Sequence, residues 1–235
     1  MKLLLFDIDQ TLINSGGAGL RALDRACLQL YGIRNAMQDI RPHGKTDPAI
    51  AREILRVRLN HSAAETGQIE SIVEAYLSFL KEEVRLSPNY RVLPGIISIL
   101  QEALSRTDVM LGLATGNVEL GARIKLDRGE LNPYFEFGGF GSDSEDRTEL
   151  VRRAARKAAG RYGKPIPASD TFVIGDTPLD IDAGKRAGFN TVGVATGSYS
   201  IEELIDSGAT FAIPDFEQGR DEFLQSALNK SETIE

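Results

Sequence analysis

Three features are scarce in this sequence. A single cysteine, Cys27, excludes an intrachain disulfide, and the apolar residues at helical spacing around it favour a packed core thiol over a nucleophile. No apolar run is long enough for a signal peptide or a membrane span, so we expect a cytoplasmic protein without membrane contact. Basic residues are outnumbered, 27 against 34 acidic ones, and the net charge of −7 argues against nucleic-acid partners.

The remaining composition is that of an ordinary soluble globular protein, with 42% apolar and 26% charged residues. Its 235 residues suffice for one large domain or two modest ones, each with a real core. An acidic surface of this kind fits a monomer or a homodimer.

The most informative stretch is the beginning of the chain. Residues 3–6 are apolar without a helical period, which predicts a buried strand that ends in Asp7 and Asp9, followed by Thr11. If the strand continued regularly, both carboxylates would share one face and lie close together. Such a pair needs a shared proton or a cation, and Mg²⁺ with oxygen ligands would serve. A polar exit from a strand is the plainer alternative.

Two patterns follow along the chain. Between residues 16 and 88 apolar residues recur at steps of three or four without any strand pattern, which predicts a small helical bundle. From residue 94 onward helices alternate with strands, including a short strand near 134–137. The last twenty residues are polar, and we expect them to fray.

Alternating strands and helices predict an α/β fold with a doubly wound, Rossmann-like parallel sheet. The first strand belongs to this sheet, so the helical bundle is an insertion. We expect a core domain of residues 1–15 and 90–235 and an inserted helical cap of residues 16–89. The linkers fall near residues 14–17 and 87–95.

Polar side chains follow three of the predicted strands. They are Asp7 and Asp9, then Thr115 and Asn117, then Asp176 and Asp180. In an open parallel sheet, ligands bind outside the carboxyl ends of the strands. Any one of these residues could be a helix N-cap, but three such coincidences favour a binding site.

These motifs resemble those of the haloacid-dehalogenase-like hydrolase superfamily over nearly the whole chain. The matching segments are Asp7-x-Asp9-x-Thr11, Thr115-Gly116-Asn117 and Gly175-Asp176-x-x-x-Asp180. The helical insertion is similar to the type-1 cap of phosphoglycolate-phosphatase-like members. One departure is Gln10, where the family usually has glycine.

The family also has a lysine or arginine as its third motif, and two residues compete for it. Lys164 lies in a Lys-Pro pair that relatives often carry, but it is too close to Asp176 for a full helix between them. Arg147 leaves room for that helix, and we favour it. A surface pairing of Arg147 with Glu145 or Asp146 is the alternative.

The resemblance implies Mg²⁺-dependent hydrolysis of a small phosphorylated metabolite through an aspartyl-phosphate. Asp7 would be the nucleophile and Asp9 the general acid and base. Arg147 and Thr115 would bind the phosphoryl group. The metal ligands would be Asp7, Asp176 and the main-chain carbonyl of Asp9. Asp180 and Asn117 would support them from a second layer.

Three other activities stay open at this point. A dehalogenase would lack the second carboxylate, Asp9, and a phospho-acceptor module would lack the large insertion. A phosphomutase of the β-phosphoglucomutase kind would share every core residue. In the cap, His43, Lys45 and Thr46 could contact substrate, since Lys45 suits an anionic group, or could form an ordinary turn before a helix.

Overall fold

The core of the protein is a six-stranded parallel sheet in the order β5-β4-β1-β6-β7-β8. The computed structural model describes residues 1–59 and 66–228. The strands of this sheet are β1 (Lys2–Phe6), β4 (Val109–Thr115), β5 (Gly138–Phe140), β6 (Thr171–Gly175), β7 (Asn190–Val194) and β8 (Phe211–Ile213). The predicted α/β class with a doubly wound parallel sheet is confirmed.

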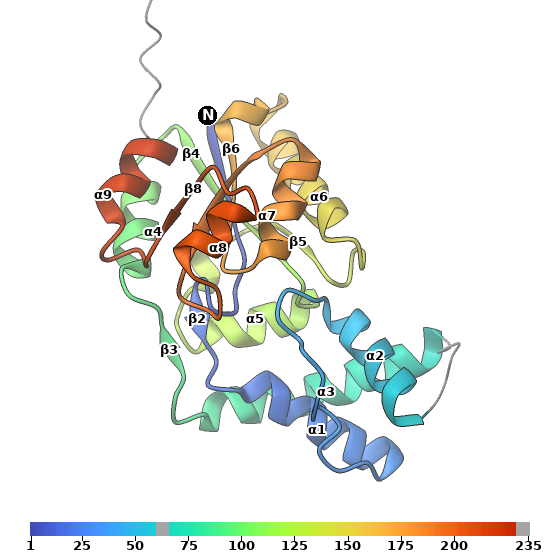
Figure 1. The fold of residues 1–235 in the computed structure, drawn as a ribbon. Coiled ribbons are helices and arrows are strands. Elements are labelled where there is room, and N and C mark those ends of the chain that lie inside the picture. Colours follow the sequence, from blue (N-terminus) through green and yellow to red (C-terminus); the bar gives the residue numbers. More distant parts are fainter. Residues whose placement is uncertain (60–65, 229–235) are drawn as a thin grey trace, which may run out of the picture.

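Helices cover both faces of the sheet (Figure 1). Because side chains alternate along β1, Leu4 and Phe6 join one hydrophobic cluster with α4, α5 and α9, while Leu3 and Leu5 join another with α6 and α7. The helices of the core are α4 (Ile96–Leu104), α5 (Glu119–Asp127), α6 (Arg147–Tyr162), α7 (Pro178–Ala187), α8 (Ile201–Asp206) and α9 (Arg220–Phe223), with short 3₁₀ turns at Asn132–Tyr134 and Ala168–Asp170.

Three further helices have a hydrophobic cluster of their own. They are α1 (Ala18–Tyr31), α2 (Asp47–Leu59) and α3 (Thr66–Leu86), and Figure 1 shows them grouped below the carboxyl ends of the central strands. Cys27 lies in this cluster, fully buried, as expected of a packed thiol. Within the described ranges, no helix is long and apolar enough to cross a membrane.

Two chain crossings join this helical group to the sheet. No strand was predicted at these crossings, yet β2 (Ile13–Asn14) and β3 (Arg91–Val92) pair as a short antiparallel ladder. The Ser87 hydroxyl also donates to the Ser15 carbonyl oxygen at 2.8 Å. Gly16 has φ of +61°, and a Cβ there would lie 2.5 Å from Ser87 Oγ. The glycine therefore allows a close approach of the two crossings.

Two local predictions were wrong. Residues 134–137 do not form the short strand, which is β5, Gly138–Phe140. A Cβ on Gly139 would lie 1.9 Å from the Leu150 carbonyl oxygen, so only glycine lets α6 pack this closely, and glycine hides the strand pattern.

The second error concerns the chain end. The last twenty residues were expected to fray, but the chain is ordered and packed as far as Leu228. Phe216 and Phe223 are buried edge to face with ring centroids 5.0 Å apart, and a π-helical turn, Leu224–Leu228, follows α9. The remaining part of that prediction, residues 229–235, lies outside the described residues.

Candidate active site

The register of the central strands brings three polar strand ends to one edge of the sheet. Phe6 of β1 pairs with Leu113 of β4 and Ile174 of β6. Thr115 and Asp176 each lie two residues beyond these partners, and Asp7 follows Phe6 directly. Parallel strands end at the same edge, so these side chains converge.

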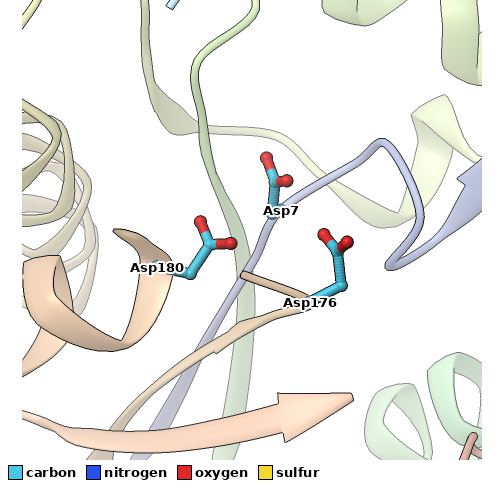
Figure 2. A group of neighbouring side chains, drawn as sticks. All are labelled: Asp7, Asp176 and Asp180. Atoms are coloured by element: carbon cyan, nitrogen blue, oxygen red, sulfur yellow. The ribbon is translucent and has the colours of Figure 1, made fainter. Parts of the chain in front are cut away.

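Asp7, Asp176 and Asp180 form a buried acidic cluster (Figure 2). One carboxylate oxygen from each lies within 4.8 Å of the others. Burial, together with the charge of Asp180, raises the pKa of Asp7 to about 7 and that of Asp176 to about 9. Three oxygen donors whose negative charges repel each other are the type of site that a hard divalent cation occupies.

Arg147 lies beside this cluster, at the first position of α6. Its Nη2 donates to Asp180 Oδ1 and lies 3.8 Å from Asp7 Oδ1. The other oxygen of Asp180 accepts from the Thr177 amide at 3.1 Å and from the Thr177 hydroxyl at 2.6 Å. Both oxygens of Asp180 thus have protein donors, and this carboxylate fixes Arg147. Lys164 is exposed, with Nζ 5.2 Å from the Tyr162 ring centroid, far from these contacts.

Asp9 belongs to a second group of charges. Its Oδ2 accepts from Lys125 Nζ at 2.5 Å and from Asn117 Nδ2 at 3.0 Å, and Asn117 Nδ2 also donates to Thr115 Oγ1 at 2.9 Å. The enclosed site alone would raise the pKa of Asp9, but the Lys125 ammonium and these hydrogen bonds hold that pKa below its ordinary value. The charge of Asp9 is therefore balanced by a lysine of the protein.

Sequence reasoning missed Lys125. Helix α5 was expected, but no role was given to its residues. A signal existed, because Lys125 lies on the same helical face as the buried Ala122 and Leu126. A lysine at a core position needs a buried partner, and here the partners are Asp9 and Asn117.

Gln10 makes the turn after these carboxylates in a glycine-like conformation. Its φ is +60°, in the left-handed region, and its amide donates to the Ile13 carbonyl oxygen at 2.7 Å. Gln10 thus adopts the left-handed conformation that glycine favours.

The loop before α2 closes over the site. His43 and Lys45 line the cavity above Asp7, and Lys45 Nζ lies 2.5 Å from Glu53. The Asp47 amide donates to the Gly116 carbonyl oxygen at 2.8 Å, and Asp47 Oδ2 accepts from the Val118 amide at 2.9 Å. Asp47, the first residue of α2, thus holds this helix against the loop that follows β4.

Thr46 has a different position from its two neighbours. The described residues that line the cavity do not include it, and its Oγ1 accepts from the Ala49 amide at 3.3 Å. The structure therefore favours the plainer interpretation of Thr46, the start of a helix.

The cavity between sheet and helices is small, about 160 Å³. Asp7, Asp9, Arg147 and Asp176 face it from the core. Four residues of the three inserted helices give it an apolar wall, namely Leu20, Leu23, Ile50 and Tyr76. The space suits a small molecule with an anionic end and a partly apolar remainder.

Comparison with known proteins agrees with this geometry. The family model "Haloacid dehalogenase-like hydrolase" matches residues 4–194, from β1 to the end of β7. The chain belongs to this family. The match spans all three polar strand ends and the inserted helices, so this haloacid dehalogenase-like hydrolase is related to the family through both its core and its insertion.

Individual relatives of this hydrolase are distant. A phosphoglycolate phosphatase of Pseudomonas fluorescens is 26% identical over 217 residues, 91% of this chain and 76% of the relative. An enolase-phosphatase E1 of Pseudomonas aeruginosa is 23% identical over 192 residues, 73% of this chain and 82% of the relative. The crystal structure of a hydrolase from Pseudomonas syringae superposes with a TM-score of 0.73 at 25% identity, covering 97% of this chain and all of the other.

Proposed function

We propose that this hydrolase is a Mg²⁺-dependent phosphatase that cleaves a small phosphomonoester through an aspartyl-phosphate on Asp7. The observation that supports it best is the meeting of Asp7, Asp9, Arg147 and the acidic cluster in one small cavity. The three inserted helices, in residues 16–89, would form a cap domain that excludes water from that cavity. Relatives that are named phosphatases support the same reaction class.

The residues present suit Mg²⁺. Asp7, Asp176 and the main-chain carbonyl of Asp9 would hold the ion, while Asp180 has both oxygens in use by Arg147 and Thr177. Bound there, the ion would supply the positive charge that lets an anionic carboxylate approach an anionic phosphate. It would also relieve the repulsion that raises the pKa values of Asp7 and Asp176.

In the first step an oxygen of Asp7 attacks phosphorus, and the bond from phosphorus to the ester oxygen breaks. Arg147, held by Asp180, and Thr115 would bind the phosphoryl oxygens and stabilise their charge. Asp9 gives its proton to the leaving oxygen. Because Lys125 and Asn117 occupy Oδ2 of Asp9, that proton lies on Oδ1. The incoming phosphate, being negative, favours this protonation.

In the second step water attacks the phosphorus of the aspartyl-phosphate and restores Asp7. Asp9, now ionised, accepts the proton of that water, so one side chain serves as acid and then as base. The low pKa of Asp9 in the unliganded site suits this second role.

Release of inorganic phosphate from a panel of small phosphorylated compounds tests the proposal. The panel includes phosphoglycolate, sugar phosphates, nucleoside monophosphates and pyrophosphate, each assayed with Mg²⁺ and with excess chelator. We expect Mg²⁺-dependent release from wild-type protein and loss of at least about 10³-fold in Asp7→Asn, because an amide is not a nucleophile. The ranking of the panel identifies the substrate class.

Three outcomes would contradict the proposal. Turnover by Asp7→Asn near the wild-type rate would rule out Asp7 as the nucleophile. Isomerised sugar phosphate without free phosphate would indicate a mutase of the β-phosphoglucomutase kind, which would use the same core residues. No reaction of any ester with folded protein would favour a module that binds phosphate without turning over.

A further inference from the structure

Lys125 lies where the core and the three inserted helices meet. Its side chain is 6% exposed, and its Nζ bridges Asp9 Oδ2 at 2.5 Å and Asn117 Oδ1 at 2.6 Å. From the helical group, Tyr76 of α3 lines the same cavity, and a Cβ on Gly19 of α1 would lie 3.7 Å from Lys125 Nζ and 3.9 Å from the Tyr76 hydroxyl oxygen. This ammonium thus contacts the proposed acid and base from the core side and the cap from the other side.

The two oxygens of Asp9 have unequal surroundings. Oδ2 accepts from two strong donors, Lys125 and Asn117. The hydroxyl of Ser15 lies 3.5 Å from Oδ1, at the limit of a hydrogen bond. The Asp9 side chain is 39% exposed, so it still reaches the cavity. One oxygen is therefore anchored and the other is free to face a ligand.

We propose that Lys125 is a positioning residue for Asp9. Its ammonium anchors Oδ2 so that Oδ1 faces the leaving oxygen of the substrate. This role rests on the proposed phosphatase function. The proton moves from Oδ1 to the leaving oxygen as the ester bond to phosphorus breaks, and Lys125 keeps its own proton throughout.

This role predicts a particular dependence on the leaving group. A nitrophenolate leaves without a proton, whereas an alkoxide needs one from Asp9. Lys125→Met removes the ammonium and keeps an apolar stem of similar length. We expect kcat/KM for the best alkyl phosphate of the panel to fall at least about tenfold more than kcat/KM for para-nitrophenyl phosphate. The ratio kcat/KM reports only steps up to leaving-group departure, so hydrolysis of the aspartyl-phosphate does not disturb it.

Two comparisons separate positioning from a general loss of structure. Arg123→Met removes a cation from the same helix, where Arg123 donates to the Phe135 carbonyl oxygen away from the cavity. We expect this control to leave the ratio of the two esters unchanged. In an Asp9→Asn background, we expect Lys125→Met to have no further effect on the alkyl ester, because the group that it positions is gone.

Each outcome of the two-ester comparison either supports or overturns the positioning role of Lys125. A parallel loss for both esters, no loss, or a shift in favour of the alkyl ester overturns the positioning role while the phosphatase function stands. If wild-type protein hydrolyses neither ester, the proposed function fails and the positioning role fails with it. If Lys125→Met shows no cooperative thermal transition, Lys125→Gln, which keeps an N–H donor for Oδ2, replaces it, and the same ratio is expected to shift by a smaller factor.

Discussion

The contact between α2 and the core contains a buried carboxylate whose charge can be removed without removing its hydrogen bond. Asp47 is 7% exposed, and its Oδ2 accepts from the Val118 amide. Asp47→Asn keeps an oxygen acceptor of the same size at this position. The variant therefore isolates the effect of burying the charge where the proposed cap meets the loop after β4.

The pKa of Asp47 in the structure gives the sign and the size of the expected change in folding stability with pH. Burial raises the pKa of Asp47 from 3.8 to about 6, although Lys125 and the Val118 amide lower it. Because the folded-state pKa lies above the unfolded one, the contribution to stability is complete below pH 3.8 and is lost as the pH rises through 6. A shift of about two pKa units corresponds to roughly 3 kcal/mol, of which about 1.5 kcal/mol is lost between pH 5 and 8.

Urea denaturation at pH 5 and pH 8, with chelator present, measures this effect. Relative to wild type, we expect Asp47→Asn to gain about 1.5 kcal/mol more stability at pH 8 than at pH 5. Asp206→Asn, which removes the same charge from an exposed position at the end of α8, is the matched control for the loss of one carboxylate. A gain at pH 8 no larger than at pH 5 would show that attraction to Lys125 outweighs burial, and the reasoning would be refuted.

Two further predictions concern ligands. We expect Mg²⁺ to raise the melting temperature of wild-type protein and not that of Asp176→Asn, because the variant loses a proposed metal ligand; an equal rise in a thermal-shift assay would exclude Asp176. We expect Lys45→Ala to raise KM for the best substrate severalfold with little change in kcat, since Lys45 lines the cavity but contacts no residue of the acidic cluster. An unchanged KM would leave the loop before α2 without a role in substrate binding.

Much of the fold was predictable because its signals are local. Alternating strands and helices predict the parallel sheet, and the end of each central strand carries its polar residue in the sequence itself. The strand at Gly138–Phe140 escaped because two of its three residues are glycine, which has a low strand propensity. A Cβ on Gly139 would collide with α6, and one on Gly138 would collide with Leu113 of β4. The buried chain end escaped because its few apolar residues, Phe216, Phe223, Leu224 and Leu228, are spread among polar ones.

The residues of the candidate site also divide into those that local sequence signals predicted and those that they missed. Asp7, Thr115 and Asp176 converge because parallel strands end at one edge, a rule that needs no knowledge of side-chain packing. The contacts of Asp47 depend on how α2 packs against the loop after β4, and no spacing along the chain encodes them. Lys125 had only a weak signal, a charged residue on the buried face of α5, and its partner Asp9 comes from a distant part of the chain. Residues whose partners come from a distant segment of the chain were therefore missed, while residues at the ends of the central strands were not.

This difference changes the physical account of the two neighbouring aspartates. The sequence suggested that one cation or one shared proton between Asp7 and Asp9 would relieve the repulsion of their negative charges. The structure shows separate surroundings instead, since Asp7 faces the acidic cluster and Arg147, while Asp9 is neutralised by Lys125. In the proposed mechanism Asp7 therefore still needs a cation to approach phosphate, whereas the charge of Asp9 is already balanced by Lys125. Under the proposal, a metal ion would bind and leave without reorienting the Asp9 carboxylate. The proposed acid and the proposed nucleophile, two residues apart, would then act in one step without competing for the same positive charge.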